Sequence, residues 1–225
     1  MEMILLILVA ALPAYVLGSL NGAIIASHLF YGKDIRKFGS GNPGLTNFFR
    51  TFGKGGVFLV ILVDAVKTAA PVIFGGWLFG FFRPEMAISE NWLFRQFFEV
   101  SLFGMTISGL FVVMGHSFPV FYGFKGGKGV MAFGTVLFVL DLRLALIVWG
   151  IFIIITLLTR FVSLGAMLGS ATIPFVQYYF LGLGGYWEFL AALLCASWLI
   201  GRHYSNIKRL IEGEESKLKF RKDKA

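Results

Sequence analysis

Long apolar runs alternate with short polar segments along the chain, and this alternation predicts membrane-spanning helices. A helix needs about 20 apolar residues to cross the hydrocarbon layer, and fewer where its neighbours shelter it. Seven runs fit, although only Asp141-Leu-Arg143 separates the fourth, which is short, from the fifth. The runs cover about 4–30, 55–82, 98–119, 129–141, 143–159, 161–182 and 187–201. We therefore expect an all-α integral membrane protein, one polytopic seven-helix domain over 1–225 with a short basic tail from about residue 202.

The composition supports a membrane protein. Hydrophobic residues make up 57% of the 225 residues and charged residues only 14%, whereas soluble domains carry about 25% charged residues. In such a chain the net charge of +8 indicates topology and contact with anionic lipids rather than nucleic acid. The first apolar run is too long for a cleaved signal, so we expect it to be retained as a span. Cys195 lies in an apolar run and offers no disulfide.

Lysine and arginine fall mainly on one side of the predicted bundle. If successive spans cross in opposite directions, 16 of the 20 lie on one side, one is Lys67 inside a span, and three lie opposite. The rich side holds 32–54, 120–128, Arg160 and 202–225, and the poor side holds Arg83, Arg95 and Arg143. The positive-inside rule places the rich side in the cytoplasm. The N-terminus is then outside and the C-terminus cytoplasmic. A six-span arrangement that fuses the fourth and fifth spans would destroy this unequal distribution of Lys and Arg, so the distribution supports seven spans.

The second span carries two charges, Asp64 and Lys67. Their spacing puts them on one helix face, where they can form an ion pair. An unpaired charge near the bilayer centre costs about 2.5–3.5 kcal/mol on insertion scales. The pair either fixes this helix inside the bundle or supports a site at the cytoplasmic surface.

A polar stretch between the first two runs reads Gly39-Ser-Gly-Asn-Pro-Gly-Leu-Thr-Asn-Phe-Phe-Arg50. Glycines let backbone amides turn toward an anion without a Cβ in the way, and a following helix start favours the anion further. The stretch is either a phosphate cradle at the membrane surface or a turn that joins two spans.

A second polar stretch, 115–129, contains His116, Lys125 and Lys128 among glycines. A nucleotide-binding P-loop would need Gly at 122 and Ser or Thr at 129, where the chain has Tyr122 and Gly129. Flexible glycines can still bring amides and two ammonium groups to one phosphate. His116 either holds the turn by a hydrogen bond or acts in chemistry.

Two further polar stretches follow on the cytoplasmic side. Thr159-Arg-Phe-Val-Ser163 can be a simple positive-inside anchor. In the stretch 201–215, Arg202, Asn206 and Arg209 would share a face of a helix that continues from the seventh span, with His203 beside them. A lipid-binding basic tail explains 217–224 better than it explains this mixed cluster.

All four stretches therefore return to one membrane face and bring cationic groups to it. Carboxylates are scarce there, and the chain has neither a carboxylate pair for Mg²⁺ nor a His/Cys cluster for zinc. We expect a site without metal or cofactor that holds two anionic groups, which favours phosphate-bearing substrates at the inner leaflet.

Three of these stretches together resemble a known family. Gly39-Ser-Gly-Asn-Pro-Gly-Leu-Thr-Asn, then Gly115-His-Ser-Phe-Pro with Phe124-Lys-Gly-Gly-Lys-Gly-Val130, then Gly201-Arg-His with Asn206-Ile-x-Arg-Leu and Gly213-Glu are similar to the signature motifs of the PlsY family. These are bacterial acyl-phosphate:glycerol-3-phosphate acyltransferases of the inner membrane. The resemblance covers nearly the whole chain, in the same order.

The resemblance implies acyl transfer from acyl phosphate to the 1-hydroxyl of glycerol 3-phosphate, giving lysophosphatidate and phosphate in the first step of phospholipid synthesis. It also implies functional coupling to an enzyme that produces acyl phosphate. The residues that it implies for catalysis are Ser40, Arg50, Lys128, His203 and Asn206. Those implied for substrate binding are Ser40, Asn42, Thr46, Asn47, Arg160 and Ser163. From the polar stretches described above we add, as substrate-binding residues, Gly39, Gly41, Gly44, His116, Lys125, Gly126, Gly127 and Arg202.

The chain departs from the family pattern at three places. Leu45 stands where the family usually has Ala, and Met131-Ala132 stands where it often has Ala-Thr. The external segment 83–97, which mixes charged and aromatic residues as interfacial segments do, is long for the family. The two apolar changes concern packing and acyl preference more than the reaction.

The histidines exclude one alternative mechanism. Other glycerolipid acyltransferases use His-x-x-x-x-Asp, but Lys33, Phe121 and Lys208 follow the three histidines at that spacing. Acyl phosphate is already activated, so we expect direct attack by the glycerol hydroxyl, with its proton passing to a substrate phosphate. Ser40 is either a phosphate ligand or a nucleophile.

Two readings from other classes compete with the enzyme. A transporter or flippase for a phosphorylated metabolite would place polar residues along a path and show repeat symmetry, and neither is evident here. A structural scaffold with a lipid-binding tail would leave three glycine-rich motifs unexplained.

Overall fold

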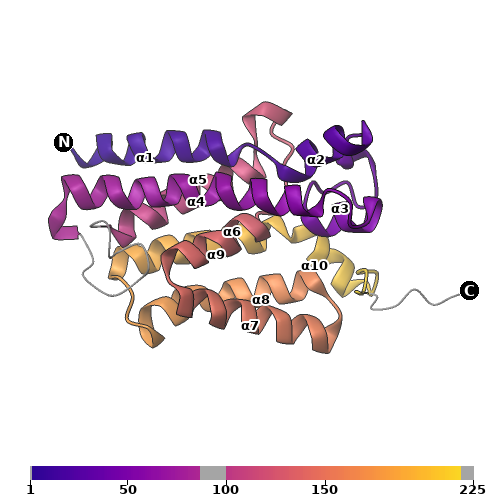
Figure 1. The fold of residues 1–225 in the computed structure, drawn as a ribbon. Coiled ribbons are helices and arrows are strands. Elements are labelled where there is room, and N and C mark those ends of the chain that lie inside the picture. The colour runs from indigo at the N-terminus through magenta and orange to yellow at the C-terminus, as the bar shows by residue number, and fades with distance from the viewer. Residues whose placement is uncertain (1, 87–99, 219–225) are drawn as a thin grey trace, which may run out of the picture. The chain divides into compact units, whose positions relative to one another are not determined.

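The computed structural model describes residues 2–86 and 100–218. Regular structure over these residues is helical, and no β-strand occurs among them, which confirms the all-α class (Figure 1). The segment 83–97, which the sequence predicts to be external, lies mostly outside the described residues, as does the basic end of the tail beyond residue 218.

The chain divides into two compact units, Met1–Leu142 and Arg143–Ala225. The first contains α1 (Met3–Gly18), α2 (Gly22–Tyr31), η1 (Ile35–Lys37), α3 (Leu45–Phe52), α4 (Val57–Phe82), η2 (Pro84–Met86), α5 (Leu102–Ser117), η3 (Val120–Tyr122) and α6 (Val130–Leu140). The second contains nearly all of α7 (Leu142–Thr159), α8 (Val162–Phe175), η4 (Val176–Phe180), α9 (Tyr186–Arg202) and α10 (Tyr204–Ile211). The expectation of a single domain stays a prediction.

In the first unit, α1, α4 and α5 pack side by side, and α6 packs on α4 and α5 (Figure 1). The buried faces carry small residues such as Ala10 and Ala14, while Ile4, Leu12 and Phe58 are exposed. Large apolar side chains on the outside suit contact with lipid, which is as apolar as the bundle interior. In the second unit, α8 packs against α9, and α10 follows α9 after a bend at His203.

The first predicted span, 4–30, is interrupted. Helix α1 ends at Gly18, and α2 begins at Gly22 because the Asn21 side chain accepts a hydrogen bond from the Ile24 amide at 2.9 Å and caps the new helix. The predicted span 4–30 therefore corresponds to the helical stretch Met3–Tyr31, but with an internal break that hydropathy alone does not register, because its signal is a single capping residue inside an apolar run.

The other predicted spans correspond to single helices, with two differences in the second unit. Span 161–182 becomes α8 followed by the π-helical turn η4. The helix expected to continue from the seventh span through Arg209 is interrupted at His203, so Arg202 lies on α9 whereas Asn206 and Arg209 lie on α10.

Four helical stretches of the described residues are long and apolar enough to cross a membrane: Met3–Tyr31, counted across its break, Val57–Phe82, Leu102–Tyr122 and Leu142–Thr159. Val130–Leu140 is apolar but shorter. The number of seven spans and the orientation of the termini stay predictions.

Glycine allows α1 and α5 to approach closely. A Cβ on Gly115 of α5 would lie 2.2 Å from the carbonyl oxygen of Tyr15, and one on Gly18 of α1 would lie 2.4 Å from that of Val112. Both obstacles are backbone atoms that cannot rotate away. Small residues at such crossings are how membrane helices bring their backbones together.

We expect Gly115→Ala to lower stability by about 1–3 kcal/mol, the usual cost of overpacking. Gly150→Ala on α7 is the matched control, because a Cβ there would meet nothing within 4 Å. Thermal unfolding of both variants in one detergent tests the contact. Equal midpoints for the two variants would contradict the close α1–α5 approach.

Candidate functional site

The loop of residues 39–47 is shaped by a side chain from the helix that follows it. Asn47 on α3 is buried, and its Oδ1 accepts a hydrogen bond from the Ser40 amide at 2.9 Å while its Nδ2 donates to the Phe38 carbonyl at 3.0 Å. Gly39 has a φ of +58°, and a Cβ there would lie 2.2 Å from Asn47 Oδ1. Asn47 therefore sets the shape of the 39–47 loop and leaves Ser40 and Thr46 exposed.

Helix α3 begins directly at this loop. Its N-cap residue, Gly44, has no side chain to cap the first turn. Backbone amides at an uncapped helix start attract anions. The sequence Pro43-Gly44 therefore ends the loop at an uncapped helix start, and such a start suits the binding of an anion such as phosphate.

The 39–47 loop meets the glycine–lysine loop (residues 123–129) at one point. The Gly127 amide donates to the His116 carbonyl at 3.1 Å, and a Cβ on Gly127 would lie 2.4 Å from His116 Nε2 and 3.1 Å from the Pro43 carbonyl oxygen. Asn21 Nδ2 donates to that same Pro43 oxygen at 3.0 Å. We call these four residues the junction. The structure thus brings together two motifs that are about 80 residues apart in the sequence.

A buried ion pair lies beneath the junction. Lys67 Nζ is 2.8 Å from Asp64 Oδ1, and the two side chains are only 1% and 2% exposed, so the predicted pairing is confirmed. Lys67 Nζ also lies 2.8 Å from His116 Nδ1 and donates to the Leu20 carbonyl in the break between α1 and α2. Asp64 Oδ1 accepts the Gly22 amide at 3.2 Å. The pair therefore holds the helix break and His116 together.

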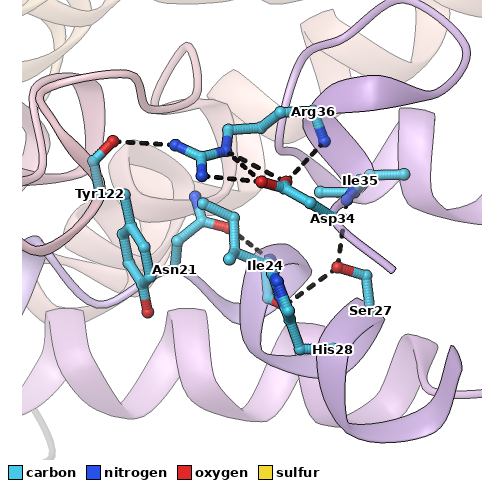
Figure 2. A network of polar contacts seen from close by, with 8 residues as sticks. All are labelled: Asn21, Ile24, Ser27, His28, Asp34, Ile35, Arg36 and Tyr122. Atoms are coloured by element: carbon cyan, nitrogen blue, oxygen red, sulfur yellow. Dashed lines mark hydrogen bonds and ion pairs between the residues drawn. The ribbon is translucent and has the colours of Figure 1, made fainter. Parts of the chain in front are cut away.

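A second ion pair, between Asp34 and Arg36, links the segments that precede the two loops, and we call it the Arg36 clamp (Figure 2). Arg36 Nη2 lies 2.8 Å from Asp34 Oδ2, and Arg36 Nη1 donates to the Tyr122 carbonyl of η3 at 2.8 Å. The Ile35 amide donates to Ser27 Oγ at 3.2 Å, which holds this segment on α2. Hydrogen bonds from the Arg36 guanidinium hold the pKa of Asp34 below its usual value. The clamp thus stays charged at neutral pH.

The cationic residues of the first unit differ in exposure. Arg50, in the last turn of α3, and Lys125 are exposed, and neither has an ion-pair partner within residues 2–86 and 100–218. Lys128 is half-buried next to Gly127 of the junction. Leu45, the departure in the first motif, packs against the buried cluster that contains Phe48, so it is a packing residue.

The second unit has a polar cluster centred on Glu215, a residue that the sequence analysis did not select. Its Oε1 accepts hydrogen bonds from Ser163 Oγ at 2.6 Å and from Asn206 Nδ2 at 2.7 Å, and its Oε2 accepts one from Arg209 Nε at 2.8 Å. Burial acts to raise the pKa of Glu215, but these hydrogen bonds outweigh it and hold the pKa below its usual value. The sequence feature that could have identified it is the motif Gly213-Glu-Glu, in which Glu215 is the second glutamate.

His203 and Arg160 are also placed in the second unit. His203 is buried, with its Nδ1 2.8 Å from the Leu199 carbonyl oxygen. A carbonyl can only accept, so Nδ1 carries the proton and Nε2 of the neutral ring is an acceptor. The Arg160 carbonyl accepts a hydrogen bond from the Leu218 amide at 2.7 Å, and the Arg160 side chain is exposed. Arg202, at the end of α9, is half-buried.

Two groups of predicted site residues therefore emerge, one in each unit. The first unit brings Pro43 of the 39–47 loop against Gly127, which also lies beside His116, and the second joins Ser163 to Asn206 through Glu215. Over the described ranges, no three or more His, Cys, Asp or Glu side chains gather in a way that could hold a metal ion.

The fold and these loops define an integral membrane protein in which polar, glycine-rich motifs are hydrogen-bonded to residues in the break between α1 and α2. The glycerol-3-phosphate acyltransferase family matches residues 8–213. The chain belongs to this family and is an acyltransferase of phospholipid biosynthesis.

Individual relatives agree with this assignment. The chain is 36% identical to a glycerol-3-phosphate acyltransferase of Dechloromonas aromatica, covering 96% of this chain and 98% of that one. It is 35% identical to one from Staphylococcus saprophyticus, over 96% and 100%. The crystal structure of PlsY (YgiH), an integral membrane glycerol 3-phosphate acyltransferase in its glycerol 3-phosphate form, matches with a TM-score of 0.77 at 30% identity over 95% and 96%. Its lysophosphatidic acid form matches with a TM-score of 0.73 at 28% identity, over 95% of each chain.

We expect Glu215→Gln to lower stability at neutral pH by about 1–3 kcal/mol, because the buried cluster loses charge-assisted acceptors. The folded pKa of Glu215 lies below the unfolded value of about 4.3, so this stabilisation is present above that pH and is lost as the pH falls through the folded pKa. Thermal melts between neutral and acidic pH should show the two proteins converging on acidification.

Glu212→Gln is the matched control, because Glu212 is more exposed and its ion pair with Lys208 spans 3.8 Å. This variant should melt close to the wild type at every pH. The cluster would be contradicted if Glu215→Gln melted at the same temperature as the wild type at neutral pH, or if the difference between their melting temperatures grew on acidification.

Proposed function

We propose that the chain transfers a fatty acyl group from an acyl phosphate to the 1-hydroxyl of glycerol 3-phosphate, giving 1-acylglycerol 3-phosphate and phosphate. The observation that carries this proposal is the contact between the 39–47 loop and the glycine–lysine loop at Pro43 and Gly127. It brings two amide-rich loops and Lys128 to one place. The crystallised relative is described in forms with glycerol 3-phosphate and with lysophosphatidic acid, which are this acceptor and this product.

The 39–47 loop is proposed as the cradle for the phosphate of the donor. Ser40, Asn42 and Thr46 present polar side chains, and the backbone around Gly39, Gly41 and Gly44 presents amides. Asn47 shapes the loop through its bonds to Ser40 and Phe38. Amides fixed in this way stabilise charge on a departing phosphate without having to reorganise.

Arg50 and Lys128, with Lys125 and the backbone of Gly126 and Gly127, are proposed to hold substrate phosphate groups. The exposure of Arg50 and Lys125 leaves their charges available to a ligand. Charge-assisted hydrogen bonds to phosphate are about twice as strong as neutral ones. These residues therefore favour an anionic substrate over a neutral alcohol.

In the second unit, His203 and Asn206 are proposed as site residues, supported by Ser163, Arg160 and Arg202. Glu215 fixes Asn206 and Ser163, as their hydrogen bonds of 2.7 and 2.6 Å indicate. The Nε2 lone pair of neutral His203 is suited to accept a hydrogen bond from a substrate hydroxyl.

The proposed reaction is a single direct transfer. The 1-hydroxyl oxygen attacks the acyl carbonyl carbon, the bond from that carbon to the phosphate oxygen breaks, and the hydroxyl proton passes to a phosphate oxygen of a substrate. The acyl phosphate is a mixed anhydride with a good leaving group, so no covalent enzyme intermediate is needed. Holding the two reactants together supplies much of the rate.

The proposal includes the location of the enzyme. We place it in the inner membrane of a bacterium with seven spans, the N-terminus outside, and the C-terminus and active site on the cytoplasmic face. The bacterial relatives and the distribution of Lys and Arg support this. A separate enzyme must supply the acyl phosphate, and membrane lipids surround the bundle.

Lys128→Ala and Arg50→Ala should each lower kcat/KM by at least about 10–150-fold, since each removes a charge-assisted contact worth about 1.5–3 kcal/mol. The assay follows phosphate release and lysophosphatidate formation from acyl phosphate and glycerol 3-phosphate by purified protein in bilayers.

Arg83→Ala and Lys208→Ala are the controls, because each removes a cation outside the proposed site; Arg83 is half-buried and Lys208 is exposed. They should keep near-normal rates. Absence of product from the wild type in both detergent and bilayers would refute the reaction, whereas normal rates for folded Lys128→Ala and Arg50→Ala would refute the site.

Direct transfer also predicts how Ser40 behaves. Initial rates should follow a sequential pattern, and quenching the enzyme with radiolabelled acyl phosphate alone should leave no label on Ser40. Ser40→Ala should keep residual activity because it loses a phosphate ligand and no nucleophile. A trapped acyl-Ser40 with ping-pong kinetics would establish the covalent route instead.

A further inference from the structure

The ion pair beneath the junction determines where His116 carries its proton. Lys67 Nζ has three neighbours: Asp64 Oδ1 at 2.8 Å, the Leu20 carbonyl oxygen, and His116 Nδ1 at 2.8 Å. The first two can only accept hydrogen bonds, and an ammonium has three N–H donors and no lone pair. The third N–H therefore points to His116, whose Nδ1 must be the acceptor. The proton of the neutral ring is then on Nε2.

This makes His116 unlike the other two histidines. His28 Nδ1 lies 2.9 Å from the Ile24 carbonyl oxygen, and His203 Nδ1 lies 2.8 Å from that of Leu199, each four residues earlier on the same helix. Both must therefore carry the proton on Nδ1. His116 alone of the three histidines turns Nδ1 toward a cation, which reverses its tautomer.

The protonated edge of His116 faces the junction. A Cβ on Gly127 would lie 2.4 Å from His116 Nε2 and 3.1 Å from the Pro43 carbonyl oxygen, so the imidazole edge and that carbonyl lie against the same face of Gly127. His116 is 3% exposed, and its backbone carbonyl accepts the Gly127 amide at 3.1 Å. The ring thus presents a fixed N–H donor where the two loops meet.

We propose that Asp64, Lys67 and His116 form a positioning relay for the acyltransferase reaction. Asp64 pairs with the Lys67 ammonium, Lys67 fixes His116 as the Nε2–H tautomer, and the His116 Nε2–H holds the glycine–lysine loop against the 39–47 loop. None of the three touches a substrate in this account. The relay rests on the proposed function for its effect on rate, but its tautomer is a property of the resting protein.

The tautomer is tested directly by nitrogen NMR of protein labelled with ¹⁵N-histidine in lipid nanodiscs. The chain has three histidines, and the signal lost in His116→Asn assigns His116. We expect Nε2 to be protonated in His116 and Nδ1 in His28 and His203. The double variant Asp64→Asn with Lys67→Met removes both charges together, which avoids an unpaired buried charge, and keeps an oxygen for the Gly22 amide. In that variant the Nδ1–H form of His116 should appear.

Two conservative substitutions separate the two edges of the ring. A glutamine at 116 places its amide N–H near the position of Nε2, whereas an asparagine reaches only the position of Nδ1. His116→Gln should therefore keep more activity, and His116→Asn should lower kcat/KM by roughly 5–150-fold, the range for leaving a buried group unpaired. The loss should appear in kcat, measured with both substrates saturating, rather than in the KM of either substrate. The reason is that the relay orients the two loops and binds neither substrate.

Members of one relay should also have non-additive effects. Adding Asp64→Asn with Lys67→Met to His116→Asn should cost little more than His116→Asn alone. Protonated Nδ1 in wild-type His116, an unchanged tautomer in the double variant, or equal activity of His116→Gln and His116→Asn would overturn the relay. A wild type that makes no product would overturn the proposed function and leave the tautomer measurement valid.

Discussion

The ammonium of Lys67 is the contact on which the first unit depends. A break in a membrane helix leaves backbone groups that hydrocarbon cannot satisfy. Lys67 donates to the Leu20 carbonyl within the break, while its partner Asp64 accepts the Gly22 amide at 3.2 Å on the far side of it. Each charge also neutralises the other. A single charge would be unfavourable in a bilayer, but the pair is tolerated there and allows the first span to be interrupted.

The break in turn supports the two glycine-rich loops. Asn21 sits within it, caps α2 through the Ile24 amide, and holds the Pro43 carbonyl at 3.0 Å. His116, held by Lys67, contacts Gly127 from the other motif. The Arg36 clamp links the segments that precede the same two loops, through the Tyr122 carbonyl. Polar loops of an acyltransferase are thereby fixed near the apolar bundle by side chains that lie inside it.

Hydropathy predicted the helical class and most helix limits to within a few residues, because the apolar runs are long and their ends are polar. It missed the break at 19–21, where the signal is a single capping asparagine, and the bend at His203. Spacing along one helix predicted the Asp64–Lys67 pair. Its contacts with Leu20 and His116 are tertiary and have no local sequence pattern. The motifs identified residues on both loops, but Glu215 was not selected because a run of glutamates beside a basic tail is typical of a solvated surface. Residues 83–97, called external from the sequence, lie mostly outside the described residues.

The central claim is that the junction of Asn21, Pro43, His116 and Gly127 positions the reacting phosphate. A crystal structure with a non-hydrolysable acyl phosphonate and glycerol 3-phosphate tests it most directly. The account predicts that the phosphonate oxygens lie within hydrogen-bond distance of the 39–47 loop, with Gly127 and Pro43 still in contact beneath it. A phosphonate bound away from that loop, or two loops that separate when it binds, would contradict the account.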